Sequence, residues 1–594
     1  MTSSEKVFPN LKTLLRYIRK FQPLLFPLLA AGILISSLQP FPYIFFSKKL
    51  FDLFAQKAPF DEVVLYAVLL VMLRLLLLML DESFSTKLSQ KMEQLDYELF
   101  KAMCRKTAWL DYYMLNSDDT RIKTQNASKA INGKNISTLI LSVKNLATGI
   151  LSMVLVTGII LTMDWSIILI IIGLVSLQSI LNGKLKKLRY DTDLELWRID
   201  RKMDWFLKFC ITGEYAREIR LNQAQPFLIR KHNSYSDRYY QIYNKIISLS
   251  SKDRQVQAIL TAVQDLFLYL LIGWRIVGGN LTVGDFSMTA SSAATFQNAL
   301  FHIIDSVNEI RNRCRYFMHY HLYMELPSTF YCLEDKRQSV PDSLENSIMT
   351  FDHVSFQYPG SDRKVLDDVS FQIRYTDVIA IVGENGAGKT TLVSLMCRLY
   401  DPTEGRILLN GTDIRNFDYD EYTGLFSVVS QDYKMFTLTV RENIRLGSKV
   451  QDETLLQYAV AGVGLDALAG KWPKGLDTML IKEFDSEGVD ISGGESQKIA
   501  LARGICRNTP FLIMDEPTSA LDPLSERNVF DTILDLAKNK TVLFISHRLS
   551  STQFANKILV MENGKLLESG THQELMRQKG KYAQLFQVQA EYYV

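Results

Sequence analysis

The sequence predicts an α-helical membrane domain with six transmembrane helices, followed by an α/β domain. Two observations carry this prediction. Long apolar runs with few charges crowd between Phe21 and Ile304, and from Thr350 onward short strand-like patterns lead into glycines and helical segments. A chain of 594 residues is also too long for one ordinary core. The expected parts are a transmembrane domain at 1–329, a linker at 330–349 and the α/β domain at 350–594.

A helix needs roughly 20 mostly apolar residues to cross about 30 Å of hydrocarbon, because unpaired backbone groups find no water there. Four segments meet this test well. Of the two weaker ones, the fifth is interrupted by Asp265, and the sixth has no formal charge but is rich in serine, alanine and threonine. A tight hairpin at Asp164 joins the third to the fourth. The predicted spans are 21–47, 63–80, 145–163, 165–183, 255–274 and 286–304.

The distribution of basic residues orients these spans, because lysine and arginine accumulate on the cytoplasmic side. The connections 82–134 and 184–254 are long and rich in both residues, so both are expected in the cytoplasm, as helices that extend below the membrane. The first twenty residues are basic and lack a small-residue cleavage site, which predicts a retained first span and a cytoplasmic N-terminus.

Polar residues inside the predicted spans are candidates for contact with a transported molecule, since burying them in lipid is costly. The alternative, which we favour for Arg74 and Lys144, is that they pair within the helix bundle or reach the membrane surface. The candidates are Arg74, Lys144, Gln178, Gln264 and Asp265.

The bulk composition excludes other classes of protein. Lysine and arginine number 67 against 64 aspartates and glutamates, so the net charge is only +3 and gives no general attraction to nucleic acid. We therefore expect no nucleic-acid partner. The six cysteines lie far apart without a CxxC pair, which predicts neither a zinc site nor a disulfide framework.

A phosphate-binding loop follows the strand predicted at 378–382. The residues from Gly383 to Thr390 read Gly-Glu-Asn-Gly-Ala-Gly-Lys-Thr, a full GxxxxGK[ST] pattern that leads into a helix predicted at 391–399. The glycines let backbone N–H groups turn toward phosphate oxygens, Lys389 reaches the β- and γ-phosphates, and Thr390 can ligate Mg²⁺. The residues expected to bind nucleotide here are Gly383, Asn385, Gly386, Gly388, Lys389, Thr390 and Thr391.

A second apolar strand, predicted at 511–514, runs directly into Asp515 and Glu516. Beside a phosphate loop, Asp515 is expected to hold Mg²⁺ and Glu516 to orient and polarise the attacking water. Phosphoryl transfer depends on such positioning and charge stabilisation more than on covalent chemistry.

The stretch Ile491-Ser-Gly-Gly-Glu495 resembles the LSGGQ signature of the ATP-binding-cassette (ABC) family, which implies an α/β P-loop ATPase domain of ABC type. The stretches Val-Val-Ser-Gln431, Ser519-Ala-Leu-Asp522 and Ile-Ser-His547-Arg resemble the Q-loop, the D-loop and the switch region of the family. The resemblance implies that Tyr358 stacks on adenine and that Asp522 belongs to the nucleotide-binding D-loop. It also implies that the Q-loop residue Gln431 ligates the metal and acts in catalysis, and that His547 is the catalytic switch histidine.

In that family each ATP lies between the phosphate loop of one nucleotide domain and the signature of a second. The resemblance therefore implies that Ser492, Gly493 and Gly494 contact nucleotide held by a partner, and that the chain works as a dimer with ATP and Mg²⁺. Glu516 and His547 are both present, which favours a homodimer, although a heterodimer stays open. The turn ahead of the helix predicted at 495–507 also offers backbone donors to a phosphate.

The order of the two domains is similar to that of half-transporter ABC exporters, and so is the stretch from Leu281 to Phe286. This resemblance implies that the loop tips at 111–118 and 212–217 rest on the nucleotide domains. The sequence departs from the family at Glu495, where glutamine is usual, at 482–488, and at Asp377, where a turn glycine is usual. We expect hydrolysis to survive these departures.

The expected function is ATP-driven export across a cell membrane, of the bacterial plasma-membrane type, with the nucleotide domain in the cytoplasm. Peptide is the preferred cargo because the phosphate-loop and signature wording resembles bacterial peptide exporters, and lipid or drug export is the alternative. A different class, an ATP-gated membrane regulator or channel, also stays open. A soluble ABC ATPase is excluded, since it would not need four clear spans.

Overall fold

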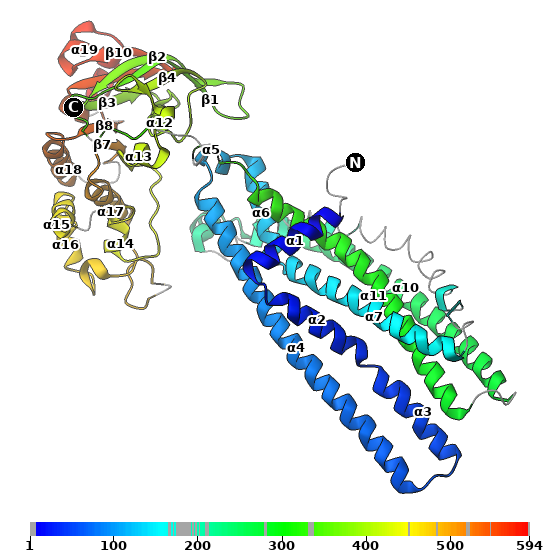
Figure 1. Cartoon of the computed structure of the whole chain (residues 1–594). Coiled ribbons are helices and arrows are strands. Elements are labelled where there is room, and N and C mark those ends of the chain that lie inside the picture. The colour runs from blue at the N-terminus through cyan, green and yellow to red at the C-terminus, as the bar shows by residue number, and fades with distance from the viewer. Residues whose placement is uncertain are drawn as a thin grey trace. The chain divides into compact units, whose positions relative to one another are not determined.

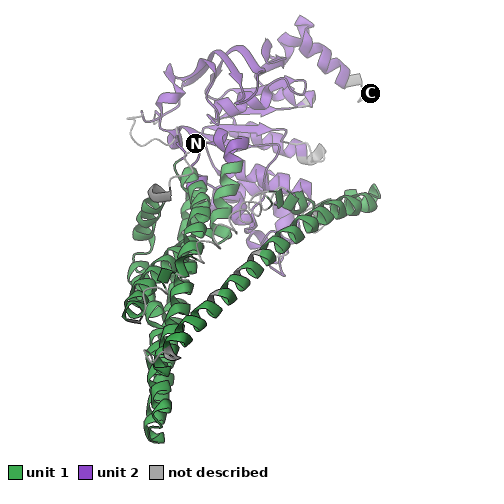
Figure 2. Cartoon of the chain, turned by 90° about the vertical axis from the view of Figure 1, so that its right-hand side faces the viewer, with its two compact units in different colours: residues 1–105, 122–325 green, residues 106–121, 326–594 purple. Residues whose placement is uncertain are grey.

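The structure is a computed structural model in which the chain forms two compact units (Figure 2). The first unit comprises residues 1–105 and 122–325, and the second comprises 106–121 and 326–594. The residues that the structure describes are 7–163, 168–169, 171–173, 192, 195–196, 199–200, 202–207, 213–277, 282–328, 330, 338–341, 343–448, 452–482, 485–517, 523–546 and 548–591.

The first unit is built from long helices (Figure 1). Helix α4 continues well beyond its predicted span, and α10 and α11 each contain a predicted span within a longer helix. The bounds are α1 (Val7–Phe21), α2 (Leu25–Leu38), α3 (Phe41–Ala55), α4 (Phe60–Ala108), α6 (Asp118–Asn132), α7 (Asn135–Met163), η2 (Gly213–Tyr215), α9 (Ala216–Leu221), α10 (Gln225–Val277) and α11 (Val283–Met324), of which α4 and α6 run across the border between the units.

Four helical stretches in the described part of the chain are long and apolar enough to cross a membrane: Leu25–Ala55, Phe60–Ala108, Asn135–Thr162 and Gln225–Arg275. The predicted span at 286–304 lies inside α11, which is not one of the four. Most of the predicted span at 165–183, with Gln178, lies outside the described residues.

The first predicted span, 21–47, is two helices and not one. Helix α2 ends at Leu38 and α3 begins at Phe41, with Pro40 at the N-cap position of α3. Proline lacks an N–H group and clashes with the preceding turn, so it is tolerated at a helix start and not in a helix interior. Helix α3 then continues to Ala55, eight residues beyond the predicted end.

The start of α11 is fixed against the end of α3. The Gly284 N–H donates to Asp52 Oδ1 at 3.0 Å, and Lys48 Nζ lies 2.7 Å from Asp285 Oδ1. A Cβ atom on Gly284 would lie 2.4 Å from the Lys48 carbonyl oxygen, so only glycine fits. Thr282 and Asp285 close a capping box at the same helix start. These contacts give a physical reason for the sequence Thr-Val-Gly-Asp at residues 282–285.

The second unit contains a four-stranded antiparallel sheet and a six-stranded, mostly parallel sheet, whose strands are the arrows in Figure 1. The first has the order β2 (Lys364–Arg374), β1 (Ile348–Gln357), β4 (Glu404–Leu409), β5 (Thr412–Asp413). The second has the order β10 (Lys565–Gly570), β9 (Lys557–Glu562), β3 (Val378–Gly383), β8 (Thr541–Ile545), β7 (Phe511–Asp515), β6 (Phe426–Val429).

Helices and short 3₁₀ turns surround these sheets. Strands β3, β8 and β7 are parallel neighbours, so the residues that follow β3 and β7 emerge at the same edge of the sheet. The bounds are α5 (Tyr112–Leu115), α12 (Lys389–Met396), η3 (Ile414–Asn416), α13 (Tyr419–Thr423), α14 (Val440–Ile444), α15 (Glu453–Gly462), α16 (Asp466–Ala469), η4 (Gly475–Asp477), α17 (Gly493–Cys506), α18 (Pro523–Leu536), η5 (Leu549–Phe554), α19 (His572–Gln578) and α20 (Lys581–Glu591).

Helix α17 packs closely on strand β6 at Gly504. A Cβ atom on Gly504 would lie 2.6 Å from Val429 Cγ2, which is closer than real side chains approach. The Ser427 hydroxyl donates to the Gly504 carbonyl at 2.8 Å. The glycine therefore lets the helix that carries the signature lie directly against the strand that leads to Gln431.

Candidate nucleotide-binding site

The phosphate loop joins β3 to α12, as the sequence predicts, although α12 begins at Lys389, two residues earlier than expected. Gly386 and Gly388 have φ of 81° and 97°, a region that favours glycine. Lys389 Nζ donates to the carbonyls of Gly383 at 2.7 Å and Glu384 at 3.0 Å. Burial lowers the pKa of Lys389, while Asp515 and Glu516 act in the opposite direction.

Asp515 is the last residue of β7 and is buried. The Thr390 hydroxyl donates to Asp515 Oδ2 at 3.1 Å, which brings together two oxygen donors predicted from separate parts of the sequence. Oxygen donors of this kind are what Mg²⁺ prefers. The donor set therefore fits the cation that the sequence predicts.

Glu516 follows directly and is held by several contacts. Its φ is +52°, an uncommon conformation for a residue other than glycine. Gln431 Nε2 donates to Glu516 Oε2 at 3.2 Å, and the Glu516 N–H donates to the Ile545 carbonyl at 3.0 Å. Strain of this kind clusters at functional sites, where the surrounding structure holds it in place.

Gln497 is a residue that the sequence analysis missed. It lies on α17, is buried, and its Nε2 donates to the Glu516 carbonyl oxygen at 3.1 Å. A signal existed, since the neighbours of this glutamine on the same face of the helix, Ala500 and Leu501 at i+3 and i+4, are apolar. A buried amide needs a partner, and Glu516 supplies it.

One cavity of about 570 Å³ gathers most of the predicted residues. Val365, which no sequence signal indicated, contributes to the wall from β2. Gly383 and Tyr358 are not among the described lining residues, but the Tyr358 hydroxyl lies 2.9 Å from Thr391 Oγ1 at the cavity wall. The lining comprises Val365, Asn385, Gly386, Ala387, Gly388, Lys389, Thr390, Thr391, Gln431, Asp515 and Glu516.

The signature residues belong to a different part of the unit. Ser492 is the N-cap of α17, and Gly493 and Gly494 form its first turn. None of the three is among the described residues that line the cavity. The Tyr433 hydroxyl donates to the Gly493 carbonyl at 3.0 Å, which ties the segment after Gln431 to the signature.

Two predicted residues, Asp522 and His547, lie outside the described residues. Their neighbours are placed: α18 begins at Pro523, and β8 ends at Ile545, directly beside Asp515 in the sheet register.

Helix α5, at the first loop tip, packs within the second unit. The rings of Tyr112 and Tyr400 meet edge to face at 5.8 Å, and Asn116 Nδ2 donates to the Tyr400 hydroxyl at 3.3 Å. Tyr400 in turn meets Tyr358 edge to face at 5.3 Å. The prediction that the tip at 111–118 rests on the nucleotide domain is confirmed. The tip at 212–217 belongs to the first unit and stays a prediction.

The fold and the cavity define a nucleotide-binding domain of the P-loop class joined to a helical membrane domain. Comparison with known proteins agrees. The ABC transporter family profile matches residues 366–519. YgaD of Bacillus subtilis (strain 168), named for multidrug export, is 31% identical over 466 residues, 76% of each chain. The subtilin transport ATP-binding protein SpaT of Bacillus subtilis is 30% identical over 442 residues, 71% of this chain and 69% of SpaT.

The ATP-dependent lipid A-core flippase of Haemophilus ducreyi is 34% identical over 350 residues, 58% of each chain. Among solved structures, a bacterial Atm1-family ABC exporter with ATP bound shares the fold, with a TM-score of 0.73, 23% identity, and coverage of 96% of this chain and 98% of that one. The chain belongs to the ABC transporter family, as an exporter-type half-transporter. It is an ATP-hydrolysing, multi-pass membrane protein.

Proposed function

We propose that the chain forms a homodimer that exports its cargo by alternating access, driven by ATP hydrolysed at two sites shared between the copies. The observation that carries this proposal is that the residues predicted to bind nucleotide lie in two separate places on one chain. The phosphate loop, Asp515 and Glu516 line one cavity, whereas Ser492, Gly493 and Gly494 lie on α17 apart from its described lining. A second copy would complete each site.

In the proposed site, the backbone N–H groups of Gly386 and Gly388 and the ammonium of Lys389 bind the β- and γ-phosphates. Tyr358 stacks on the adenine, with its ring held by the bond to Thr391. Asn385 and the backbone at Gly383 complete the loop. We assign Asp522 and His547 to the D-loop and the switch position of the same site.

Glu516 would orient the attacking water and accept its proton. Its carboxylate is preorganised by the Gln431 amide, and its main chain is held by Gln497 and Ile545. Thr390, Asp515 and Gln431 would hold Mg²⁺, which supplies neutralising charge beside the phosphates. The bond between Thr390 and Asp515 supports this assignment.

We place the transmembrane domain at 1–329, the linker at 330–349 and the nucleotide domain at 350–594, with six spans. The N-terminus and the nucleotide domain face the cytoplasm. The four apolar helices support a membrane domain, and the long basic connections support its orientation. The uninterrupted course of α11 through 286–304 is compatible with a sixth span.

Peptide is the proposed cargo, with lipid or drug export as the alternative. Relatives named for subtilin transport, multidrug export and lipid A-core flipping all align with long stretches of the chain, so each cargo class belongs in the test. An ATP-gated regulator or channel would use the same nucleotide site without pumping.

The decisive experiment measures ATP hydrolysis by the full chain in lipid nanodiscs, comparing the wild type with Glu516→Gln across panels of peptides, lipids and drugs. We expect the variant to bind ATP and to lose about 10²–10⁴-fold in turnover, because the phosphate cradle stays while water activation goes. Stimulation of the wild type by one class of compound would identify the cargo. Normal turnover in Glu516→Gln would contradict the assignment of the base.

Transport against a gradient in proteoliposomes separates an exporter from a channel. Uphill accumulation of the stimulating compound, dependent on ATP and absent in Glu516→Gln, is the expected result. Downhill flux alone, opened by ATP, would favour the regulator or channel.

A further inference from the structure

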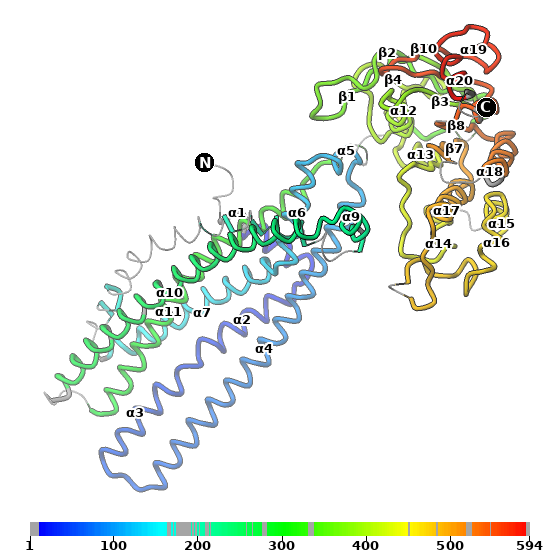
Figure 3. Tube along the Cα trace, turned by 180° about the vertical axis from the view of Figure 1, so that it is seen from behind, coloured from blue at the N-terminus to red at the C-terminus, as the bar shows by residue number. Residues whose placement is uncertain are grey.

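The last described helix, α20, contacts the phosphate loop directly. Lys581, its first residue, places Nζ 2.9 Å from Glu384 Oε1 and 2.5 Å from Glu562 Oε1. Glu384 is the second residue of the phosphate loop, and its main-chain carbonyl accepts a hydrogen bond from Lys389. The same loop residue therefore binds the phosphate-binding lysine through its backbone and α20 through its side chain. Figure 3 shows α20 near α19 and β10.

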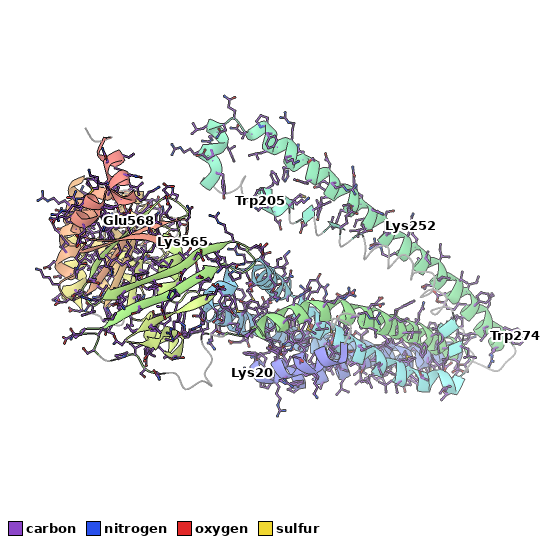
Figure 4. All side chains as sticks on the ribbon, turned by 90° about the horizontal axis from the view of Figure 1, so that it is seen from above. Lys20, Trp205, Lys252, Trp274, Lys565 and Glu568 are labelled. Atoms are coloured by element: carbon purple, nitrogen blue, oxygen red, sulfur yellow. The ribbon has the colours of Figure 1, made fainter. Side chains whose placement is uncertain are left out.

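A lysine is unexpected at this position of a helix. The N-terminus of a helix carries partial positive charge, which disfavours a cation there. The Glu568 carboxylate on β10, labelled in Figure 4, offsets this by accepting hydrogen bonds from the N–H groups of Lys581 at 2.5 Å and Tyr582 at 3.1 Å. Hydrogen bonds from Lys581 to Glu562 and Glu384 raise the pKa of Lys581, so it stays charged at neutral pH. Helix stability alone does not account for this lysine.

The same helix is joined to the segment after β8. Gln589 Oε1 accepts a hydrogen bond from the Leu549 N–H at 2.8 Å, and Leu549 lies two residues beyond the predicted switch histidine His547. Nearer the start of α20, the buried Tyr582 hydroxyl lies 2.7 Å from Thr552 Oγ1 in η5. Helix α20 thus reaches the phosphate loop with one end and the segment that follows His547 with the other.

We propose that α20 is a positioning element of the nucleotide site, in which Lys581 acts through Glu384 to tune the affinity of the phosphate loop for ATP. The inference rests on the proposed ATP site. The Glu384 carboxylate adds negative charge to a loop that binds an anion, and Lys581 neutralises this charge and holds it on the side of α20. A variant without Lys581 leaves the carboxylate free to repel the phosphates.

The test measures ATP affinity by equilibrium binding, together with KM and kcat for hydrolysis, in full-length protein in nanodiscs. Lys581→Met is expected to raise Kd and KM by about two- to tenfold, a modest factor because the ion pair is partly exposed. The kcat should change little, since Lys581 does not touch the cavity. Lys581→Arg, which keeps the charge, should behave as the wild type.

Glu384→Gln should change the Kd for ATP in the opposite direction from Lys581→Met. It removes the repelling charge, so Kd should equal or fall below the wild-type value. Adding Lys581→Met to it should raise Kd by less than Lys581→Met does alone, because only Glu562 then loses its partner. Raising the salt concentration should shrink the effect of Lys581→Met alone, because partly exposed charges are screened. If Lys581 had only a structural role, the two variants would not change Kd in opposite directions, and the effect of Lys581→Met would not depend on salt.

Lys579→Met is the matched control. Lys579 lies two residues earlier, is exposed, and makes no ion pair with any residue that the structure describes, so its removal should leave Kd unchanged. A Kd for Lys581→Met equal to that of this control would overturn the proposal, as would an undiminished effect in the Glu384→Gln background. If Lys581→Met does not fold, Glu384→Gln alone tests the pair, and an increase in its Kd would overturn the proposal.

The binding readout keeps this inference separate from the proposed function. A wild type that binds ATP but hydrolyses it no faster than Glu516→Gln would contradict the proposed function, while the Kd series would still decide the role of Lys581.

Discussion

Glu495 occupies the signature position where the family usually has glutamine, and the structure shows what its carboxylate does. Glu495 Oε2 accepts hydrogen bonds from the Ser492 N–H at 2.7 Å and the Ser492 hydroxyl at 2.8 Å. The Glu495 N–H donates back to Ser492 Oγ at 3.3 Å, which completes a capping box. The signature serine is therefore held by a charged partner on its own helix.

Glu495→Gln should lower the KM for ATP by about two- to fivefold. Glutamine preserves the capping box, whereas loss of the negative charge removes repulsion of a phosphate that approaches Ser492. ATP-dependent hydrolysis rates across a concentration series would measure this. Glu495→Asp, which keeps the charge, is the control, and an unchanged KM in Glu495→Gln would indicate that the carboxylate lies too far from the nucleotide to matter.

Gln497→Leu should lower kcat more than it weakens ATP binding. The change removes the donor to the Glu516 carbonyl and leaves that carbonyl without this partner, which costs about 1–3 kcal/mol of stability for a buried group. Glu516 then loses one of the contacts that hold its uncommon backbone conformation. Thermal unfolding and steady-state kinetics would test both effects. A fall in stability with unchanged kcat would show that Gln497 supports only the fold.

At the scale of the element, Tyr400 joins the loop-tip helix α5 to the nucleotide site. Its ring meets the rings of Tyr112 of α5 and of Tyr358 edge to face, and it is buried. Arg398, also buried, lies over the rings of Phe330 and Tyr419 beside the same surface. The described contacts thus run without a break from the predicted adenine residue to the loop.

Tyr400→Phe and Tyr400→Ala should separate two roles of this residue. Phenylalanine keeps the ring and loses only the hydrogen bond with Asn116, so hydrolysis and its stimulation by cargo should persist. Alanine removes the ring and should lower the free energy of unfolding by about 3–5 kcal/mol. It should also abolish stimulation by cargo, while the Kd for ATP changes by only a few fold. ATPase assays with and without the stimulating compound measure this. Full stimulation in Tyr400→Ala would show that α5 does not transmit through Tyr400.

Functional motifs made of residues next to one another in the sequence could be predicted from the sequence alone. The phosphate loop between β3 and α12, and Asp515 at the end of β7 with Glu516 directly after it, follow from local patterns of apolar residues and glycines. Contacts between distant positions could not be predicted in this way. The bonds of Gln497 to Glu516 and of Lys581 to Glu384 depend on which helices the fold brings together. The break at Pro40 lay within a hydrophobic run whose composition concealed it.

At the scale of the whole molecule, the proposed sharing of sites between two copies can be tested by mixing inactive variants. Lys389→Ala disables the phosphate loop and leaves the signature intact, whereas Gly493→Asp does the reverse. A Cβ atom added at Gly493 meets no atom within 4 Å in the described structure, so the second variant should fold. Each variant alone should hydrolyse little ATP.

Co-expression of the two variants should restore roughly a quarter of the wild-type rate, because about half of randomly paired dimers contain one intact site of two. Hydrolysis by the whole purified population of co-expressed dimers in nanodiscs measures this. Mixed dimers that stay as inactive as each parent would contradict sites shared between copies.

The close contact at Gly504 also limits how related sequences can diverge. The helix that begins at the signature and the strand that leads to Gln431 meet there with no space for a methyl group beside Val429. A lineage that acquires alanine at 504 has to lose volume at 429, so substitutions at these two positions should be inherited together. Helix α17 and strand β6, far apart in sequence, should therefore diverge together at this contact.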